Sequence, residues 1–317
     1  MNIIFTEPIY KDYIWGGKKL KSKLNKNTLY EKTAESWEIS TNRNGISKIK
    51  NAEYREKTLK ELFENQELRE KIFGIRTKEL KEFPLLIKFI DAKENLSIQV
   101  HPDDEYAKQN GIDSGKTEMW YVIECKENAQ IIGGLNTKIS KEELKQTIED
   151  NKIKEYLNHI DIKAGDSIYI PAGTIHAILE DTLICEIQQN SDTTYRVYDW
   201  DRKDKEGKER QLHKKEAIET IKTENIPTIV HTTEELQFQK IVQSEFFEVE
   251  KINCNECYED CSDVNTFYAI NIIDGKGSIQ TSTNEYKIVK GDSFIIPATL
   301  GKYFIKGNVQ FLKSYIL

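Results

Sequence analysis

The chain has 317 residues, and its 46 lysine and arginine side chains against 53 aspartate and glutamate side chains give a net charge of −7 at pH 7. A chain of this length forms one large or two moderate domains with a sizeable core. The acidic balance argues against nucleic acid or an anionic membrane as a partner, so the site for an anionic substrate would have to be locally basic.

Nothing in the sequence predicts export or membrane insertion. Residues 1–5 contain no basic segment and only a short apolar run, unlike a signal peptide. No stretch approaches the roughly 18 apolar residues of a membrane span. Cys254, Cys257 and Cys261 form a C-x2-C-x3-C cluster without an evident fourth metal ligand, so free thiols are the better interpretation. We expect a soluble, cytoplasmic monomer or weak homodimer.

Apolar patterns along the chain predict a mainly β protein with a few helices. Strands are predicted near residues 3–5, 10–15, 34–39, 84–90, 119–124, 131–134, 167–170, 182–189 and 266–281. Helices are predicted over residues 57–74, 140–158 and 212–221. Thr58 with Glu61, and Ser140 with Glu143, form the capping boxes that open the first two helices.

Lys88 interrupts the otherwise apolar run of residues 84–90, which is typical of a buried strand. Its long side chain could reach the edge of the sheet while its methylene groups stay buried. Alternatively, the ammonium group could face a polar cavity. The sequence leaves both interpretations open.

An internal repeat organises the second half of the chain. The sequence GDSIYIPA at residues 165–172 recurs 126 positions later as GDSFIIPA at residues 291–298. A duplicated β module with a helical insertion in the first copy accounts for this repeat. No histidine lies beyond His231, so the second module cannot hold a histidine-based metal site. We predict an N-terminal domain of residues 1–235 and a degenerate C-terminal domain of residues 236–317.

Four residues suggest a metal site in the first module. Gln99 and His101 are two apart in an alternating run and share one face of a strand. Glu118 lies seventeen residues beyond His101, and His176 follows the turn of the first repeat. Each residue alone is more often a hydrogen-bonded core residue. Together, two imidazoles, a carboxylate and an amide oxygen suit one Zn²⁺ per chain, with water or substrate completing its coordination.

Cationic residues cluster in the sequence with these candidate ligands. Lys88, Lys116 and Arg196 would each ordinarily be a solvated surface charge, but together they could provide a basic site for a sugar phosphate. Glu186 lies among apolar neighbours on the strand after His176. It is either paired with a cation such as Arg196 or a candidate acid or base, and the sequence does not decide between these roles.

Long ordered motifs over essentially the whole chain resemble type I mannose-6-phosphate isomerases, in the short bacterial form found in Firmicutes. These motifs are residues 85–88, 97–104, 115–120, 170–177 and 189–199. The resemblance implies a cupin fold of two jelly-roll barrels with helical insertions. It also implies zinc-dependent interconversion of mannose 6-phosphate and fructose 6-phosphate, which would pass through a cis-enediol. The implied zinc ligands are Gln99, His101, Glu118 and His176.

The resemblance also implies roles for the charged residues. It assigns catalytic roles to Arg196, Glu186 and Lys116, and substrate binding to Ser97 and Lys88. The large helical domain of the eukaryotic form is reduced here to residues 140–158, so phosphate contacts from that domain do not transfer.

Two other functions fit the same ligand types. Cupins with two histidines and a carboxylate also hold Fe(II) in oxygenases. A sugar-binding paralogue could keep the ligands without turnover. The Gln99-x-His101 pair and the basic residues favour the isomerase over the oxygenase, and Glu186 and Arg196 argue against the non-catalytic paralogue.

Overall fold

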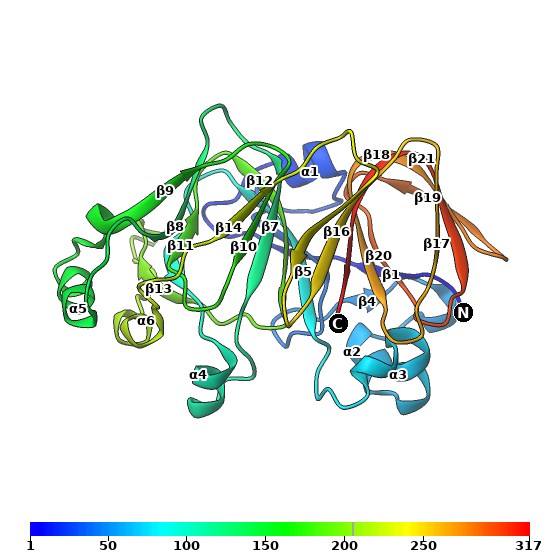
Figure 1. Cartoon of the computed structure of the whole chain (residues 1–317), viewed down its shortest axis with the longest axis horizontal. Coiled ribbons are helices and arrows are strands. Elements are labelled where there is room, and N and C mark those ends of the chain that lie inside the picture. The colour runs from blue at the N-terminus through cyan, green and yellow to red at the C-terminus, as the bar shows by residue number, and fades with distance from the viewer. Residues whose placement is uncertain (205) are drawn as a thin grey trace.

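The computed structural model describes residues 1–204 and 206–317 and shows two β-barrels side by side (Figure 1). The predicted mainly β architecture of two jelly-roll barrels is confirmed. Short helices flank the barrels at their ends (Figure 1). Among the described residues, none of the helices combines the length and apolar character that a membrane crossing requires.

The first barrel consists of two antiparallel sheets. The seven-stranded sheet has the order β14 (Thr228–His231), β10 (Asp166–Ile170), β7 (Glu118–Glu124), β12 (Thr182–Gln189), β5 (Leu85–Ala92), β3 (Glu35–Ile39) and β2 (Ile9–Lys11). The five-stranded sheet has the order β13 (Tyr195–Tyr198), β6 (Ile98–Val100), β11 (His176–Ile178), β8 (Gln130–Leu135) and β9 (Leu157–Asp161).

The second barrel is a nine-stranded sheet that curls on itself (Figure 1). Its order is β15 (Phe238–Gln243), β16 (Glu248–Cys254), β21 (Lys302–Tyr315), β18 (Tyr268–Gln280), β20 (Ser293–Ile296), β1 (Ile4–Glu7) and β4 (Lys48–Ile49), with β17 (Cys257–Cys261) on β21 and β19 (Glu285–Val289) on β18. Where β18 and β21 bend, a Cβ on Gly275 would lie 2.0 Å from the carbonyl oxygen of Asn308, and its φ is +81°. Glycine is therefore needed there.

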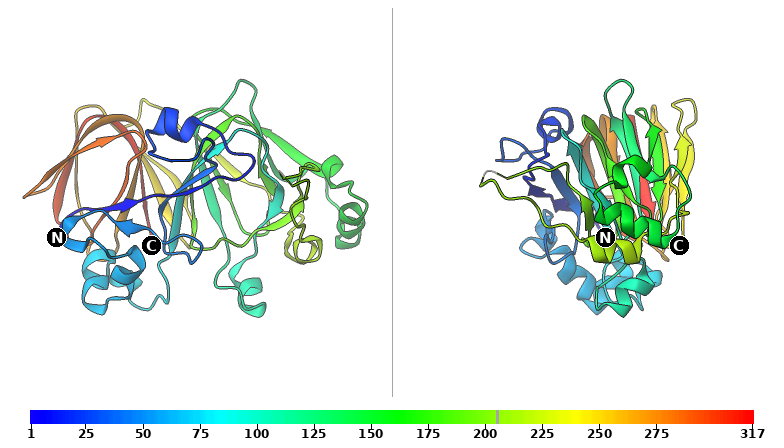
Figure 2. Two further views of the ribbon diagram at one scale, coloured as in Figure 1. Left: turned by 180° about the vertical axis from the view of Figure 1, so that it is seen from behind. Right: turned by 90° about the vertical axis from the view of Figure 1, so that its left-hand side faces the viewer.

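The N-terminal segment belongs to both barrels. Strand β1 pairs with β20, with Ile4 opposite Ile295, and the chain then crosses to the first barrel (Figure 2). The described residues form six α-helices, which are α1 (Lys19–Leu24), α2 (Leu59–Glu64), α3 (Gln66–Phe73), α4 (Asp104–Gln109), α5 (Lys141–Glu149) and α6 (Lys214–Thr220). Helix α3 contacts the second barrel, since the N–H of Ala298 donates to the carbonyl of Ile72 at 2.8 Å. Strands β1 and β4, which precede residue 235, thus belong to the sheet of the second barrel. The domain boundary near residue 235 stays a prediction.

Both predicted capping boxes form, at Thr58 before α2 and at Ser140 before α5. Helix α5 covers only part of the range predicted as helical, because a 3₁₀ turn over Ile153–Tyr156 leads directly into β9. The strand predicted over residues 10–15 is wrong beyond Lys11. There the chain turns, and the N–H of Gly16 donates to the carbonyl of Tyr13.

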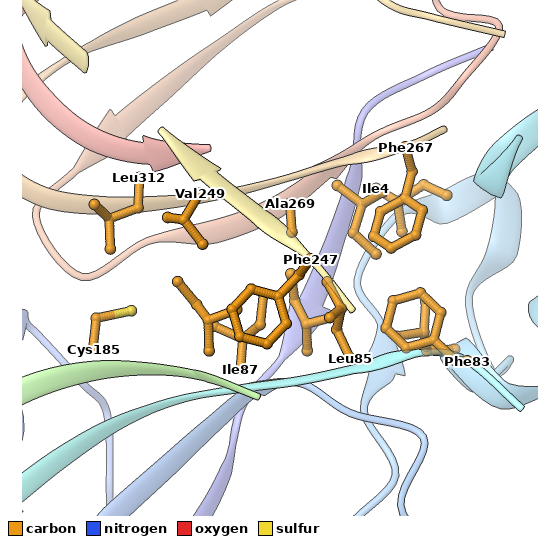
Figure 3. Packing of buried hydrophobic residues seen from close by; sticks show 14 of the residues in the cluster. Ile4, Phe83, Leu85, Ile87, Cys185, Phe247, Val249, Phe267, Ala269 and Leu312 are labelled. Carbon is orange, nitrogen blue, oxygen red and sulfur yellow. The ribbon is translucent and has the colours of Figure 1, made fainter. Parts of the chain in front are cut away.

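The seven-stranded sheet is buried on both faces. On one face Leu85, Ile87 and Cys185 pack against Phe247 and Leu312 of the second barrel (Figure 3). Burying a large apolar side chain of this kind contributes about 1.5–3 kcal/mol. Because side chains alternate along a strand, the intervening residues of β5, β7 and β12 point into the first barrel. The nearly continuous apolar sequence of β5 follows from this double burial.

The internal repeat allows the two barrel interiors to be matched position by position. Ile168 of β10 corresponds to Phe294 of β20, 126 residues later. Following the cross-strand partners from these two residues gives one row in each barrel. The rows are Ile168, Trp120, Glu186 and Lys88 in the first barrel, and Phe294, Ile270, Lys313 and Glu250 in the second. The lysine–glutamate pair of the first barrel therefore recurs in the second with the two charges exchanged.

Lys313 is enclosed by anions in the second barrel. Its Nζ lies 3.0 Å from Glu250 Oε2 and 3.0 Å from Asp260 Oδ2, and the side chain is 9% exposed. Burial alone would lower the pKa of Lys313, but the carboxylates of Glu250 and Asp260 hold it above its ordinary value. The second barrel thus keeps a charged interior without any histidine.

Replacing Lys313 should destabilise the protein strongly. Lys313→Met leaves two carboxylates without their cation and should lower the free energy of unfolding by about 3–5 kcal/mol in urea denaturation. Lys302→Met is the matched control, because Lys302 pairs with Glu259 on the surface, where a pair contributes about 1 kcal/mol or less. Equal losses in the two variants would contradict a structural role for the buried network.

Candidate active site

Two rows of side chains face each other inside the first barrel. In the five-stranded sheet, Gln99 lies opposite both His176 and Arg196. In the seven-stranded sheet, the facing row includes Trp120 and Glu186. The rings of Trp120 and His176 are in edge contact, with centroids 5.5 Å apart. Pairing register within each sheet thus aligns the polar side chains, and barrel closure brings the two rows together.

Three of the four predicted metal ligands converge in the barrel interior. Glu118 lies between the two histidines, with Oε2 3.4 Å from His101 Nε2 and Oε1 3.3 Å from His176 Nε2. The possible ligand atoms of all three lie within 4.8 Å of one another, and all three residues are buried. These distances fit a single ion shared by the three side chains.

Hydrogen bonds to the backbone fix the tautomers of both histidines. His101 Nδ1 lies 2.8 Å from the carbonyl of Thr193, and His176 Nδ1 lies 2.9 Å from the carbonyl of Thr174. A carbonyl can only accept, so each Nδ1 carries the proton and each Nε2 presents a lone pair to Glu118. Metal-binding histidines characteristically use their second nitrogen in this way.

Burial keeps these histidines neutral. It lowers the pKa of His101 well below its usual range, with Lys116 adding to the effect, and lowers the pKa of His176 to about 4. Burial also raises the pKa of the Glu118 carboxyl to about 7, against the opposing charge of Lys116. Both carboxylate oxygens of Glu118 are enclosed. Oε1 has no hydrogen bond among the described residues, whereas Oε2 lies 2.7 Å from Lys116 Nζ. Buried lone pairs of this kind are suited to a cation.

Gln99 lies beside the histidines, with its amide nitrogen 3.5 Å from His176 Nε2. Its amide oxygen points instead towards the hydroxyl of Ser97, at 3.4 Å. Coordination through oxygen would require the amide to turn over, which exchanges the positions of its nitrogen and oxygen. The role of Gln99 as a fourth metal ligand therefore stays a prediction. Its side chain lies within reach of the three converging ligands.

Lys116 joins the metal-ligand cluster to the neighbouring pocket. Its Nζ lies 2.7 Å from Glu118 Oε2 and 2.9 Å from His101 Nε2. The side chain is 5% exposed, yet it lines the pocket described below. A buried ammonium group that touches both the ligands and the pocket can act on a substrate bound there.

Lys88 and Glu186 form a buried ion pair rather than separate charges. Lys88 Nζ lies 3.1 Å from Glu186 Oε1 and 3.8 Å from Glu35 Oε2, and Trp120 Nε1 donates to Glu186 Oε2 at 2.9 Å. Of the alternatives open from the sequence, Lys88 thus faces the polar interior, and the cation beside Glu186 is Lys88 rather than Arg196.

The Lys88–Glu186 pair holds both groups in their charged forms. Burial would lower the pKa of Lys88, but the carboxylates of Glu186 and Glu35 hold it above its ordinary value. Burial would raise the pKa of Glu186, but Lys88 and Lys116 keep it below its ordinary value. Glu186 is therefore ionised at neutral pH and weakly basic.

A pocket of about 330 Å³ opens beside these groups. It brings together six of the predicted site residues, which are Lys88, Ser97, Gln99, Lys116, Glu186 and Arg196. Arg196 donates to the carbonyl of Gln211 at 2.8 Å, while its buried Nε has no hydrogen bond among the described residues. A larger pocket of about 530 Å³ near Phe246 and Leu317 contains none of the predicted site residues, so the smaller one is the candidate substrate site.

Several residues of the pocket were not predicted from the sequence. They are Tyr13, Trp15, Glu35, Asp192, Thr194 and Arg210. Glu35 carried little signal, because its short strand also contains the polar residues Ser36 and Glu38. Tyr13 and Arg210 lie in irregular segments, where the sequence pattern does not predict which way a side chain points.

Comparison with known proteins identifies the family. Residues 4–128 match the catalytic domain of type I phosphomannose isomerases, and residues 237–316 match the mannose-6-phosphate isomerase cupin domain. The chain is 40% identical to the probable mannose-6-phosphate isomerase GmuF of Bacillus subtilis, covering 98% of each chain. It is 39% identical to the mannose-6-phosphate isomerase of Streptococcus mutans, covering 95% of this chain and 94% of that one. The chain belongs to the type I phosphomannose isomerase family.

Solved structures agree with this assignment. The mannose 6-phosphate isomerase of Bacillus subtilis superposes with a TM-score of 0.92 at 39% identity, covering 100% of both chains. A phosphomannose isomerase variant from Salmonella typhimurium superposes with a TM-score of 0.78 at 15% identity, which shows a shared fold. The predicted resemblance to this isomerase family is thus confirmed over the whole chain.

Loss of one histidine should strongly weaken metal binding. His176→Asn removes one of three converging ligand atoms and should weaken the affinity for Zn²⁺ by about 100-fold or more, measured by elemental analysis after dialysis against a competing chelator. His159→Asn is the matched control, because His159 is exposed on β9. Retention of one zinc per chain in both variants would show that the ion is held elsewhere.

Proposed function

We propose that this protein is a zinc-dependent aldose–ketose isomerase that interconverts mannose 6-phosphate and fructose 6-phosphate. The observation that carries the proposal is the cluster of His101, Glu118 and His176 beside a pocket lined by buried cations. Family membership supports the isomerase reaction. The similar proteins are mannose-6-phosphate isomerases, which supports mannose 6-phosphate as the substrate. A pocket of about 330 Å³ is within the range of small-ligand sites.

The donor set suits a borderline divalent ion. Two neutral imidazoles and an enclosed carboxylate would hold Zn²⁺, with Gln99 in reach as a fourth ligand. Such an ion supplies Lewis-acid stabilisation of the negative charge that develops on O1 and O2 of the sugar during enolisation. We propose one ion per chain, because the histidines of the described chain converge on one cluster only.

Arg196 would stabilise the same developing charge. It projects from β13 on the same face as Gln99, its cross-strand partner, and it lines the pocket. The backbone carbonyl of Gln211 orients its guanidinium group before substrate binds. A preoriented positive charge lowers the barrier because it need not reorganise when the enediol forms.

Proton transfer between C1 and C2 requires a group that faces the pocket. Glu186 is held ionised by Lys88 and Trp120, so it is a weak base that fixes the position of its neighbours. Lys116 touches Glu118 and lines the pocket. We propose that Lys116 carries the proton, because its amino group lines the pocket beside Glu118, and that Glu186 orients the charged network.

Ser97 would contact the substrate phosphate, because its hydroxyl lies at the pocket wall next to Gln99. Lys88 was predicted from the family resemblance to bind substrate. Its closest partners are the carboxylates of Glu186 and Glu35, so we propose that it balances their charge beneath the sugar. The absence of competing bulk water in this buried network makes its charges more effective.

An enzyme assay tests this proposal directly. The purified, zinc-loaded protein should convert mannose 6-phosphate to fructose 6-phosphate in an assay coupled to a fructose 6-phosphate-consuming enzyme. A chelator should abolish the activity and added Zn²⁺ should restore it. Oxygen uptake with bound Fe(II) would instead support the cupin oxygenase. Zinc binding without turnover would support the non-catalytic paralogue.

Arg196→Ala should separate catalysis from metal binding. Because its charge acts on the developing enediolate, the change should lower kcat by about 100-fold or more while raising KM much less. Zinc content should stay at one per chain. If both zinc content and kcat survive the substitution, the role given to Arg196 is wrong.

A further inference from the structure

The candidate pocket has a charge-balanced interior, and its more exposed lining includes the guanidinium group of Arg210 as well as the carboxylate of Asp192. Lys88 and Glu186, both about 5% exposed or less, neutralise each other in the interior. Arg210 also lines the pocket, and its side chain is 25% exposed. The more accessible end of the pocket therefore carries a guanidinium group.

Asp199 fixes the orientation of Arg210. The Nε of Arg210 donates to Asp199 Oδ2 at 2.7 Å and its Nη2 donates to Oδ1, which is a bidentate arrangement. Arg202 shares the same carboxylate, donating from Nη2 to Oδ1 at 2.6 Å. The buried carboxylate of Asp199 thus binds two guanidinium groups. These three side chains together carry a net positive charge. Nη1 of Arg210 makes no hydrogen bond within the described chain and is available to a ligand.

The turn that carries Asp199 is anchored beside Ser97. Trp200 and Asp201 both adopt left-handed backbone conformations, with φ of 60° and 54°. Such conformations cost on the order of 1–3 kcal/mol each and persist only where the surroundings enforce them. Trp200 Nε1 donates to the carbonyl of Leu96 at 2.7 Å. Arg210 is thereby held in a fixed relation to the segment that contains Ser97.

Arg196 and Arg210 line the same pocket, and among the described residues Asp199 forms an ion pair with Arg210 but not with Arg196. Burial lowers the pKa of Arg196, and the positive charge of Arg210 lowers it further. Two like charges in a partly buried site repel each other, and an anion between them removes the repulsion. Guanidinium groups match the oxygens of a phosphate group better than an ammonium does.

We propose that Arg210, positioned by Asp199, binds the substrate phosphate at the exposed end of the pocket and so selects phosphorylated sugars. This inference rests on the proposed isomerase function and adds a residue that determines its specificity. The phosphate would lie against Arg210 and Ser97, and the sugar carbons would reach inward towards Gln99 and Lys116. Asp199 is a positioning residue, because it acts through Arg210.

Substitution of Arg210 should affect the phosphate and leave the sugar chemistry intact. Arg210→Gln should raise KM for mannose 6-phosphate and Ki for inorganic phosphate by about tenfold or more, with kcat changed less than about threefold. The kcat/KM for unphosphorylated mannose should stay unchanged. Lys203→Gln is the matched control, since it removes one exposed cation from the same segment and should alter neither constant.

Two further variants separate positioning from folding. Arg210→Lys keeps the charge without the bidentate fork, so it should recover part of the lost phosphate affinity. Asp199→Asn should weaken phosphate binding through Arg210 and leave kcat for unphosphorylated mannose intact. If these variants lower both substrates' kcat/KM equally, the effect is structural and the proposal fails.

Direct titration with inorganic phosphate distinguishes this inference from the isomerase proposal. If the unmodified protein binds phosphate and Arg210→Gln weakens that binding, the site is confirmed even when mannose 6-phosphate is not isomerised. If isomerase activity is present but calorimetry gives the same phosphate affinity in both proteins, Arg210 does not hold the phosphate and the inference is overturned.

Discussion

Burial of the seven-stranded sheet on both faces is the constraint on which the rest of the structure depends. One face joins the barrels through Ile87, Phe247 and their neighbours, and the other presents Glu118 and Glu186 to the site. Because side chains alternate strictly along each strand, packing of the inter-barrel core also sets the register of the polar row. The second barrel therefore supports the chemistry of the first without contributing a ligand.

Burial of the charged side chains inside the first barrel sets the protonation states of the site. Charges that lose water must pair, so Lys88 lies against Glu186 and Glu35. Imidazoles that lose water stay neutral, and their backbone hydrogen bonds direct free lone pairs towards Glu118. The same burial would prepare these groups for the proposed cation and for the proposed anionic transition state.

Local patterns in the sequence predicted much of this arrangement. The strand pattern and the GDSxxIPA repeat predicted a duplicated β module, and the family resemblance implied two barrels. The capping boxes form, and the predicted ligands His101, Glu118 and His176 do converge. What local patterns could not supply is pairing between distant segments. Strand β1 pairs with a strand almost 300 positions away, with Ile4 opposite Ile295. The orientations of Lys88 and Arg210 likewise depend on partners that only the folded chain brings near.

The exchanged ion pair in the second barrel has a consequence for how the two halves respond to their surroundings. In the first barrel, part of the interior positive charge would come from a dissociable ion, so its electrostatic balance varies with metal supply. In the second, Lys313 provides that charge through a covalently attached side chain. The C-terminal half would therefore keep its charge balance while the proposed metal site of the first barrel empties and refills.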